Sequence, residues 1–167
     1  MPTASQTFAG GLSSVRDARR FLSAALQAWD GAHYDFGAPQ VLSELATNAA
    51  LHARSSYTVT VALDDDGLLL EVTDGSSRLP RARHYAPDAT TGRGMGLVAA
   101  LSLEWGASTV QAGKTVWARV APDETALEFD LDELLSADEP VPVRRAVRRA
   151  DPRGASGTFQ PHEAKAS

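Results

Sequence analysis

The spacing of apolar residues in the first third of the chain predicts two helices. The first begins at Ser14, which together with Asp17 resembles a capping box, and its apolar positions recur at helical intervals until about Gly31. The second helix follows Pro39. Its apolar face consists of Leu42, Leu45, Ala46, Ala49 and Ala53.

Alternating apolar and polar residues further along the chain predict two pairs of strands. Residues 57–63 and 68–73 are joined by the turn Asp64–Gly67, whose Asp-Gly ending favours a tight hairpin. Residues 105–111 and 114–120 show the same alternation and form the second pair. Because neither pair has a helix between its strands, an antiparallel arrangement is favoured within each pair.

The two predicted hairpins are separated by an irregular segment and a third helix. Residues 75–96 follow neither period and exceed the roughly 12 to 15 residues beyond which structureless loops become uncommon, which is typical of a lid or binding loop. Residues 96–104 have helical spacing. The order of elements predicts a two-layer α/β (α+β) sandwich, in which helices cover one face of a mixed, mostly antiparallel sheet.

Composition limits the classes of protein to consider. The 167 residues, 43% of them hydrophobic, suffice for one core, and the absence of cysteine excludes disulfides and thiolate metal sites. The N-terminus lacks the features of a signal peptide and no apolar run is long enough to span a membrane, so we expect a cytoplasmic protein without membrane contact. No basic face with interleaved aromatic residues occurs in the nearly neutral part before residue 123, so direct nucleic-acid binding is not expected.

The charge distribution divides the chain into a folded part and a tail. Residues 1–122 are predicted to form the single domain. Residues 123–137 contain a short apolar patch that predicts one further element, formed by Leu127, Phe129, Leu131, Leu134 and Leu135. Residues 138–167 are charged and proline-containing, and we expect them to be disordered.

Three separated clusters carry residue types that suit nucleotide chemistry. Glu44 and Asn48 lie one helical turn apart, so their side-chain oxygens share a helix face and suit a magnesium ion and a general base. Asp74 ends an apolar strand, where a carboxylate can accept a hydrogen bond from the exocyclic amine of adenine. The segment Gly92–Gly96 opens the third helix, and its glycines let backbone N–H groups approach phosphates closely.

Each cluster also has an ordinary structural explanation when it is taken alone. Exposed Glu and Asn side chains are common on solvated helices, Asp74-Gly75 is a typical turn pair, and Gly92–Gly96 is compatible with a flexible loop. No strand leads directly into Gly92, and no P-loop pattern occurs in the chain, so the two common nucleotide-binding folds are disfavoured. The order and spacing of all three clusters therefore carry the functional argument.

Together the three clusters resemble those of the GHKL (Bergerat-fold, histidine kinase-like) ATPases, specifically the branch of anti-sigma factor serine/threonine kinases. The resemblance covers roughly residues 5 to 121. The segment Glu44–His52 resembles the family's N box, Asp74–Ser76 its first glycine box and Gly92–Leu97 its second. The closing segment Gly113–Trp117 also fits the family.

The resemblance implies a role for each matching residue in binding ATP and magnesium. Glu44 would be the catalytic base, Asn48 would coordinate magnesium, and Asp74 would bind the adenine amine with Thr115 in the surrounding hydrogen bonds. Arg93 would neutralise phosphate charge, and His52 would lie near the site unless it is a structural histidine of the helix. The nucleotide-binding residues implied in this way are Asn48, Asp74, Gly75, Gly92, Arg93, Gly94, Met95, Gly96, Leu97 and Thr115.

One departure from the family pattern leaves two functional interpretations open. The family's first glycine box has two further glycines, where this chain has Ser76 and Arg78. The first interpretation is a regulator that transfers the γ-phosphate of ATP to a serine of an antagonist protein and sequesters a sigma factor. The second is a regulator with little or no catalysis that acts only by sequestering its partner.

The resemblance also bears on assembly and excludes one relative. Related kinases pair as dimers, and the first helix with Trp29 would supply a homodimer contact, although an amphipathic helix covering its own sheet explains the same pattern. A complete sensor histidine kinase is disfavoured, because the chain has no coiled-coil phosphoacceptor domain and no membrane span.

Overall fold

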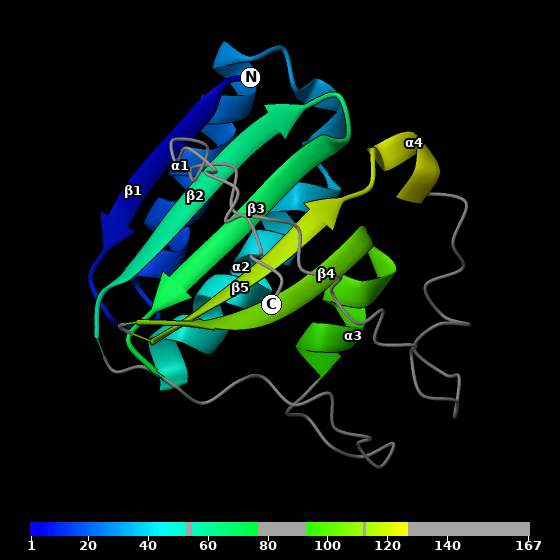
Figure 1. The fold of residues 1–167 in the computed structure, drawn as a ribbon. Coiled ribbons are helices and arrows are strands. Elements are labelled where there is room, and N and C mark those ends of the chain that lie inside the picture. Colours follow the sequence, from blue (N-terminus) through cyan, green and yellow to red (C-terminus); the bar gives the residue numbers. More distant parts are fainter. Residues whose placement is uncertain (53–54, 77–92, 112, 127–167) are drawn as a thin grey trace, which may run out of the picture.

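The computed structural model describes residues 1–52, 55–76, 93–111 and 113–126, which form one sheet and the helices packed on it (Figure 1). In chain order the elements are β1 (Thr3–Phe8), α1 (Ser14–Ala28), the 3-10 helix η1 (Ala32–Tyr34), α2 (Gly37–His52), β2 (Tyr57–Asp64), β3 (Gly67–Asp74), α3 (Arg93–Ala100), β4 (Ser102–Val110), β5 (Gly113–Val120) and α4 (Asp123–Ala126).

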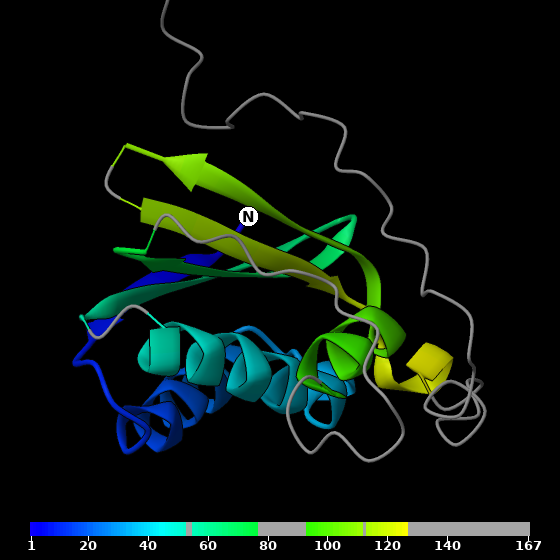
Figure 2. The ribbon, with the colours of Figure 1, turned by 90° about the horizontal axis from the view of Figure 1, so that it is seen from below.

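The sheet has five strands in the order β1-β2-β3-β5-β4, and every pairing between them is antiparallel. Figure 2 shows the helices gathered on one face of this sheet. The predicted two-layer α+β class is therefore confirmed, as is the hairpin turn, in which Asp64 pairs with Gly67. Gly67 has a φ of 114°, a backbone conformation that glycine adopts without strain.

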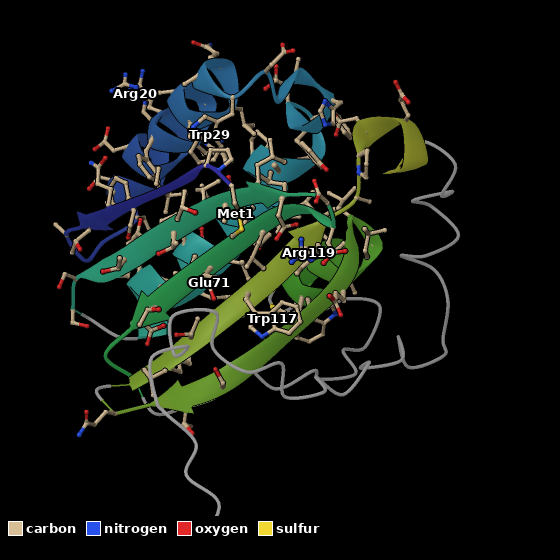
Figure 3. The ribbon with its side chains drawn as sticks, turned by 45° about the horizontal axis from the view of Figure 1, so that its top comes forward. Met1, Arg20, Trp29, Glu71, Trp117 and Arg119 are labelled. Atoms are coloured by element: carbon tan, nitrogen blue, oxygen red, sulfur yellow. The ribbon has the colours of Figure 1, made fainter. Side chains whose placement is uncertain are left out.

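Strand alternation decides which side chains face the helices. Along β3, Leu68, Leu70 and Val72 are buried, and they join a core that includes Leu42 and Leu45 of α2. The intervening residues lie on the other face of the sheet, where Figure 3 shows Glu71 of β3 beside Trp117 and Arg119 of β5. The core lies between the helices and one sheet face, and successive strand residues point to opposite faces. Whether a residue has an odd or even position along its strand therefore determines whether its side chain can reach the helix layer.

Strand β1 was not predicted from the sequence. Its residues are mostly polar and exposed, so they lack the alternation that marks a half-buried strand. The strand is instead held at the sheet edge by its backbone pairing with β2 and by hydroxyl pairs, Ser5 with Thr60 at 3.1 Å and Thr7 with Thr58 at 2.9 Å. A polar edge strand of this kind can be identified only when the strand that pairs with it is known.

The capping box predicted at the start of α1 is wrong, although the helix does begin at Ser14. The Ser14 hydroxyl donates to the carbonyl oxygen of Gly11 at 2.7 Å and lies 2.9 Å from the Tyr57 hydroxyl. Asp17 instead lies on the exposed side of the helix, 3.4 Å from Arg20. Burial of Ser14 against β2 thus takes its hydroxyl away from the helix N-terminus.

The third helix lies about three residues earlier than predicted, at Arg93–Ala100. Residues 93–96, assigned to the loop from their glycines, are helical, and residues 102–104, assigned to the helix, open β4. The apolar spacing was misleading because Leu101 is buried between the two elements while Leu103 is exposed on the edge strand. Pairing with β5, with a register shift between Ser102 and Glu104, extends β4 at the expense of the helix.

The short helix α4 connects the end of the described chain to α2. Both carboxylate oxygens of Asp123 accept backbone hydrogen bonds, from Phe36 at 2.9 Å and from Gly37 at 2.8 Å, at the N-terminus of α2. The predicted apolar patch after residue 126, the tail 138–167 and the loop residues 77–92 lie outside the described residues. None of the helices in the described ranges has the length and apolar content needed to cross a bilayer.

Candidate functional site

Glu44 lies on α2 directly against the first turn of α3. A methyl group placed on Gly94 would collide with Oε2 of Glu44 and would come within 2.9 Å of its carboxyl carbon. A larger residue at position 94 would have to push this carboxylate aside, so glycine lets α3 approach it closely. The same glycine that the sequence suggested for phosphate binding also makes room for the predicted base.

The environment of Glu44 suits a proton acceptor. Its side chain is half-buried, and burial raises its pKa above the ordinary value because a charged carboxylate loses hydration there. A raised pKa brings a carboxylate closer to the pH at which it both loses and accepts a proton, which is the requirement for a general base. Perturbed carboxyl groups of this kind cluster at functional sites.

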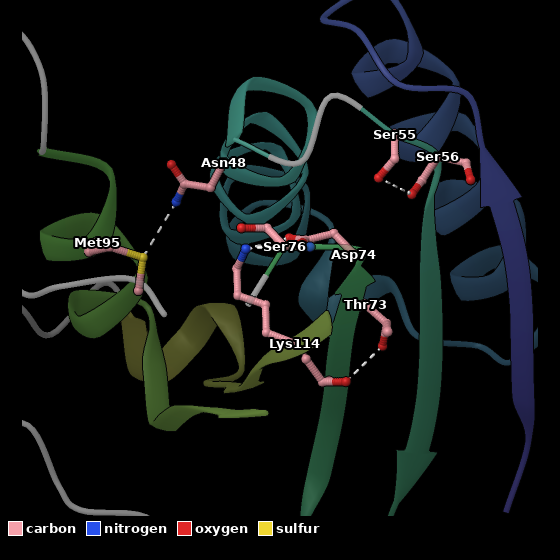
Figure 4. Close-up of polar contacts among 9 residues, drawn as sticks. Asn48, Ser55, Ser56, Thr73, Asp74, Ser76, Met95 and Lys114 are labelled. Atoms are coloured by element: carbon pink, nitrogen blue, oxygen red, sulfur yellow. Dashed lines mark hydrogen bonds and ion pairs between the residues drawn. The ribbon is translucent and has the colours of Figure 1, made fainter. Parts of the chain in front are cut away.

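Asn48 lies one turn further along α2 and contacts the same helix. Its amide nitrogen donates to the sulfur of Met95 at 3.6 Å, as Figure 4 shows. Because an amide group is planar, this contact turns the carbonyl oxygen of Asn48 away from Met95, where it remains an oxygen ligand of the type that magnesium prefers. Glu44 and Asn48 thus lie on one face of α2, and both contact α3.

Asp74 ends β3 on the face that the helices cover, and it is paired with a lysine. The register places Lys114 of β5 directly opposite, with its ammonium nitrogen 2.9 Å from Oδ1 and 2.8 Å from Oδ2 of Asp74 (Figure 4). Oδ1 also accepts the backbone N–H of Ser76 at 2.8 Å. Only 2% of the Asp74 side chain and 4% of the Lys114 side chain are exposed, so this is a buried ion pair.

Thr115 is not brought together with Asp74. The two residues face opposite sides of the sheet, because Thr115 pairs with Thr73 and their hydroxyl oxygens lie 2.8 Å apart on the face away from the helices. The residue that sequence reasoning missed is Lys114. Its signal was the strand alternation, since Lys114 shares its parity with the buried Val116.

The glycines near Asp74 and in α3 have different surroundings. Gly113 has a φ of 148°, and a methyl group there would collide with the carbonyl oxygen of Asp74, so the end of β3 and the start of β5 touch through their backbones. Gly75 is exposed, and no atom of the described residues lies within 4 Å of a methyl group placed on Gly96. Leu97 packs partly buried against the core.

Some predicted site residues fall outside the description. Gly92 lies outside the described residues, and so do the side chains of Arg93 and His52, although their backbones belong to α3 and α2. Within the described ranges, no three His, Asp or Glu side chains gather that could hold a metal ion. A magnesium ion at this site would therefore depend on Asn48, water and phosphate oxygens as ligands.

The two halves of the site differ in how well they fit magnesium and ATP. The half between α2 and α3 fits, because it combines an amide oxygen, a half-buried carboxylate and the N-terminus of a helix, where backbone N–H groups favour anions. The half at Asp74 fits less well, because both of its carboxylate oxygens already accept hydrogen bonds within the protein.

Fold and site together define a two-layer α+β domain in which α2 and α3 face each other beside the end of β3. The family model of the histidine kinase-like ATPase domain matches residues 8–120, and the chain belongs to this family. No curated protein was found to match the chain. The matched range begins at the last residue of β1 and ends with β5, so it includes every described element that positions the site.

Proposed function

We propose that the protein is an ATP-binding regulator of the anti-sigma kinase type, which transfers the γ-phosphate of ATP to a serine of an antagonist protein and sequesters a sigma factor. Membership of the histidine kinase-like ATPase family supports the nucleotide-binding part of this proposal. The kinase activity and the two protein partners rest on the resemblance of the three motifs to that branch.

The observation that carries the proposal is the contact between Glu44 and the first turn of α3. It places a half-buried carboxylate with a raised pKa beside a helix N-terminus, and Asn48 lies one turn away on the same face. A base and a phosphate-binding helix end must be adjacent for phosphoryl transfer, because the attacking hydroxyl loses its proton close to the phosphate.

Each residue of this half has a separate task. Bound ATP with magnesium supplies the phosphoryl group. Asn48 would offer its carbonyl oxygen to the metal ion, and the backbone N–H groups at the start of α3 would hold phosphate oxygens. Glu44 would accept the proton of the attacking serine hydroxyl while the serine oxygen bonds to the γ-phosphorus. The bond from the γ-phosphorus to the bridging oxygen would break at the same time, so that ADP leaves.

The experiment is a transfer assay with ATP labelled in its γ-phosphate and a panel of purified antagonist proteins. Replacing Glu44 with alanine should abolish phosphorylation, a loss of at least about 100-fold for removal of a general base, while ATP binding is retained. Glu124 of α4 is exposed and provides the matched control. Glu124→Ala should transfer phosphate at the wild-type rate, and undiminished transfer by Glu44→Ala would contradict the assigned role.

A second candidate, sequestration without efficient catalysis, is favoured by a specific observation. Asp74 is neutralised by Lys114 inside the protein, and Ser76 stands where the family has glycine. Under this alternative the Glu44→Ala variant would bind and release the sigma factor as the wild type does. Loss of phosphorylation with a changed transcriptional output would instead support the kinase.

A further inference from the structure

The pairing of Asp74 with Lys114 occupies the carboxylate that the resemblance to the GHKL ATPases assigns to the nucleotide base. The ammonium group bridges both carboxylate oxygens at 2.8 and 2.9 Å, and the Ser76 N–H adds a third hydrogen bond to Oδ1. Opposite positions on paired strands hold the two side chains together. The contact is therefore built into the sheet and does not depend on a chance side-chain conformation.

Burial makes this pair difficult to separate. Removing one partner of a buried ion pair leaves the other charge without compensation, which is strongly unfavourable. A ligand that donates a hydrogen bond to Asp74 must therefore share the carboxylate with Lys114. An acceptor whose charge is already neutralised forms a weaker hydrogen bond than a free carboxylate does.

The pair also presents a different chemical pattern from that of an aspartate alone. A lone carboxylate accepts hydrogen bonds and so selects a purine with an amino group at position 6. The ammonium group of Lys114 donates hydrogen bonds and suits an oxygen at the same position. A site with acceptor and donor side by side can satisfy either substituent.

We propose that Lys114 removes the preference for adenine from this site, so that 6-amino and 6-oxo purine nucleotides bind with similar affinity. This inference rests on the proposed function, because it concerns how the same site recognises the base. Affinity then comes mainly from the triphosphate and the metal ion held between α2 and α3. Lys114 becomes the residue that determines base specificity.

The test compares the dissociation constants of magnesium ATP and magnesium inosine triphosphate by calorimetry. These nucleotides share ribose and triphosphate, and their bases differ at position 6 and at the ring nitrogen beside it. Wild type should bind both within about threefold, whereas Lys114→Met should prefer ATP by about tenfold or more, the factor expected when a hydrogen bond to a freed charge is gained.

Two control variants separate base recognition from charge and stability. Arg119→Met removes a cation and an ion pair from the same strand, at the end far from Asp74, and should keep the wild-type ratio. Lys114→Arg retains a cationic hydrogen-bond donor beside Asp74 and should also keep the wild-type ratio. If Lys114→Met does not fold, the ratios of wild type and Lys114→Arg decide the question.

Several outcomes would overturn the inference. A wild-type preference for ATP of about tenfold or more would overturn it while leaving ATP binding intact. An unchanged ratio of dissociation constants in folded Lys114→Met would also overturn the inference. Weaker ATP binding by that variant would overturn it too, because Lys114 would then be a ligand of ATP itself. Failure of both nucleotides to bind any variant would instead contradict the proposed function, and the inference with it.

Discussion

At the scale of single residues, Glu44 and Gly94 depend on each other. The carboxylate occupies the space that any side chain at position 94 would need, whereas the space around Gly96, two residues along the same helix, is open. The two glycines therefore provide a matched pair. One allows close packing of a functional side chain, and the other lowers helix stability without a contact in the described structure to explain it.

Gly96→Ala should stabilise the protein by about 0.5 kcal/mol, because alanine favours the helix and its methyl group meets no atom of the described residues. Gly94→Ala should stabilise the protein less than Gly96→Ala does, since its methyl group must displace the Glu44 carboxylate. In a Glu44→Ala background the collision is absent, and Gly94→Ala should then stabilise the protein as Gly96→Ala does.

Urea unfolding of wild type, Gly94→Ala, Glu44→Ala and the double variant measures this coupling as a double-mutant cycle. Equal stabilisation by Gly94→Ala and Gly96→Ala with Glu44 intact would show that the carboxylate does not lie against α3.

The side chains of the site were predictable to different degrees. Glu44 and Asn48 share a helix face in any regular helix, so their spacing alone placed them together. Thr115 and Lys114 are neighbours in the sequence, but only the register between β3 and β5 decides which one reaches Asp74. Long-range pairing of this kind is not encoded in the local pattern of either strand.

At the scale of elements, an ion pair joins the β2–β3 turn to β5. Arg119 donates to Asp64 at 2.6 Å and to the carbonyl oxygen of Gly67 at 3.2 Å. Burial would raise the pKa of Asp64, but hydrogen bonds from Arg119 and from the N–H groups of the turn outweigh it and lower the pKa below its usual value. The turn is therefore held by a carboxylate that the folded state keeps ionised.

Asp64→Asn should lower the free energy of unfolding at neutral pH by about 1 kcal/mol, the typical value for a hydrogen bond to a charged group at a partly exposed site. A folded-state pKa below the unfolded one means that this stability is present above the unfolded pKa and is lost as the pH falls through the folded pKa. Wild type and variant should therefore converge in acid.

Urea unfolding at neutral and acidic pH measures this difference. Asp65→Asn, at an exposed position of the same turn, is the control and should change little at either pH. A difference for Asp64→Asn that persists undiminished in acid would contradict the ion pair as its cause.

The elements themselves were largely predictable, and the failures have specific causes. Both hairpins and the first two helices have apolar periods long enough to identify them. Strand β1 was missed because polar residues at a sheet edge need no apolar face, and α3 was displaced because Gly94 and Gly96 lower helix propensity in sequence while Glu44 and the core favour the helix in the fold. Tertiary contacts override local propensity at both places.

At the scale of the whole molecule, the domain has a sheet face covered by helices and an open face, on which none of the described helices packs. Glu44, Asn48, Asp74 and Lys114 all lie on the helix side of the sheet. Trp117, Arg119 and Thr115 lie on the other side, away from the site (Figure 3). Nucleotide binding is therefore expected to affect the contact between α2 and α3, and to leave the open face largely unchanged.

The measurement that tests the account most directly is a calorimetric titration of the wild-type protein with ATP, with and without magnesium. Every proposed role of Glu44, Asn48 and Asp74 depends on a nucleotide at this site. An ATP site between α2 and α3 predicts saturable, magnesium-dependent binding with a dissociation constant in the micromolar range. No binding at millimolar ATP, with or without magnesium, would contradict it and leave a regulator that acts through protein contacts alone.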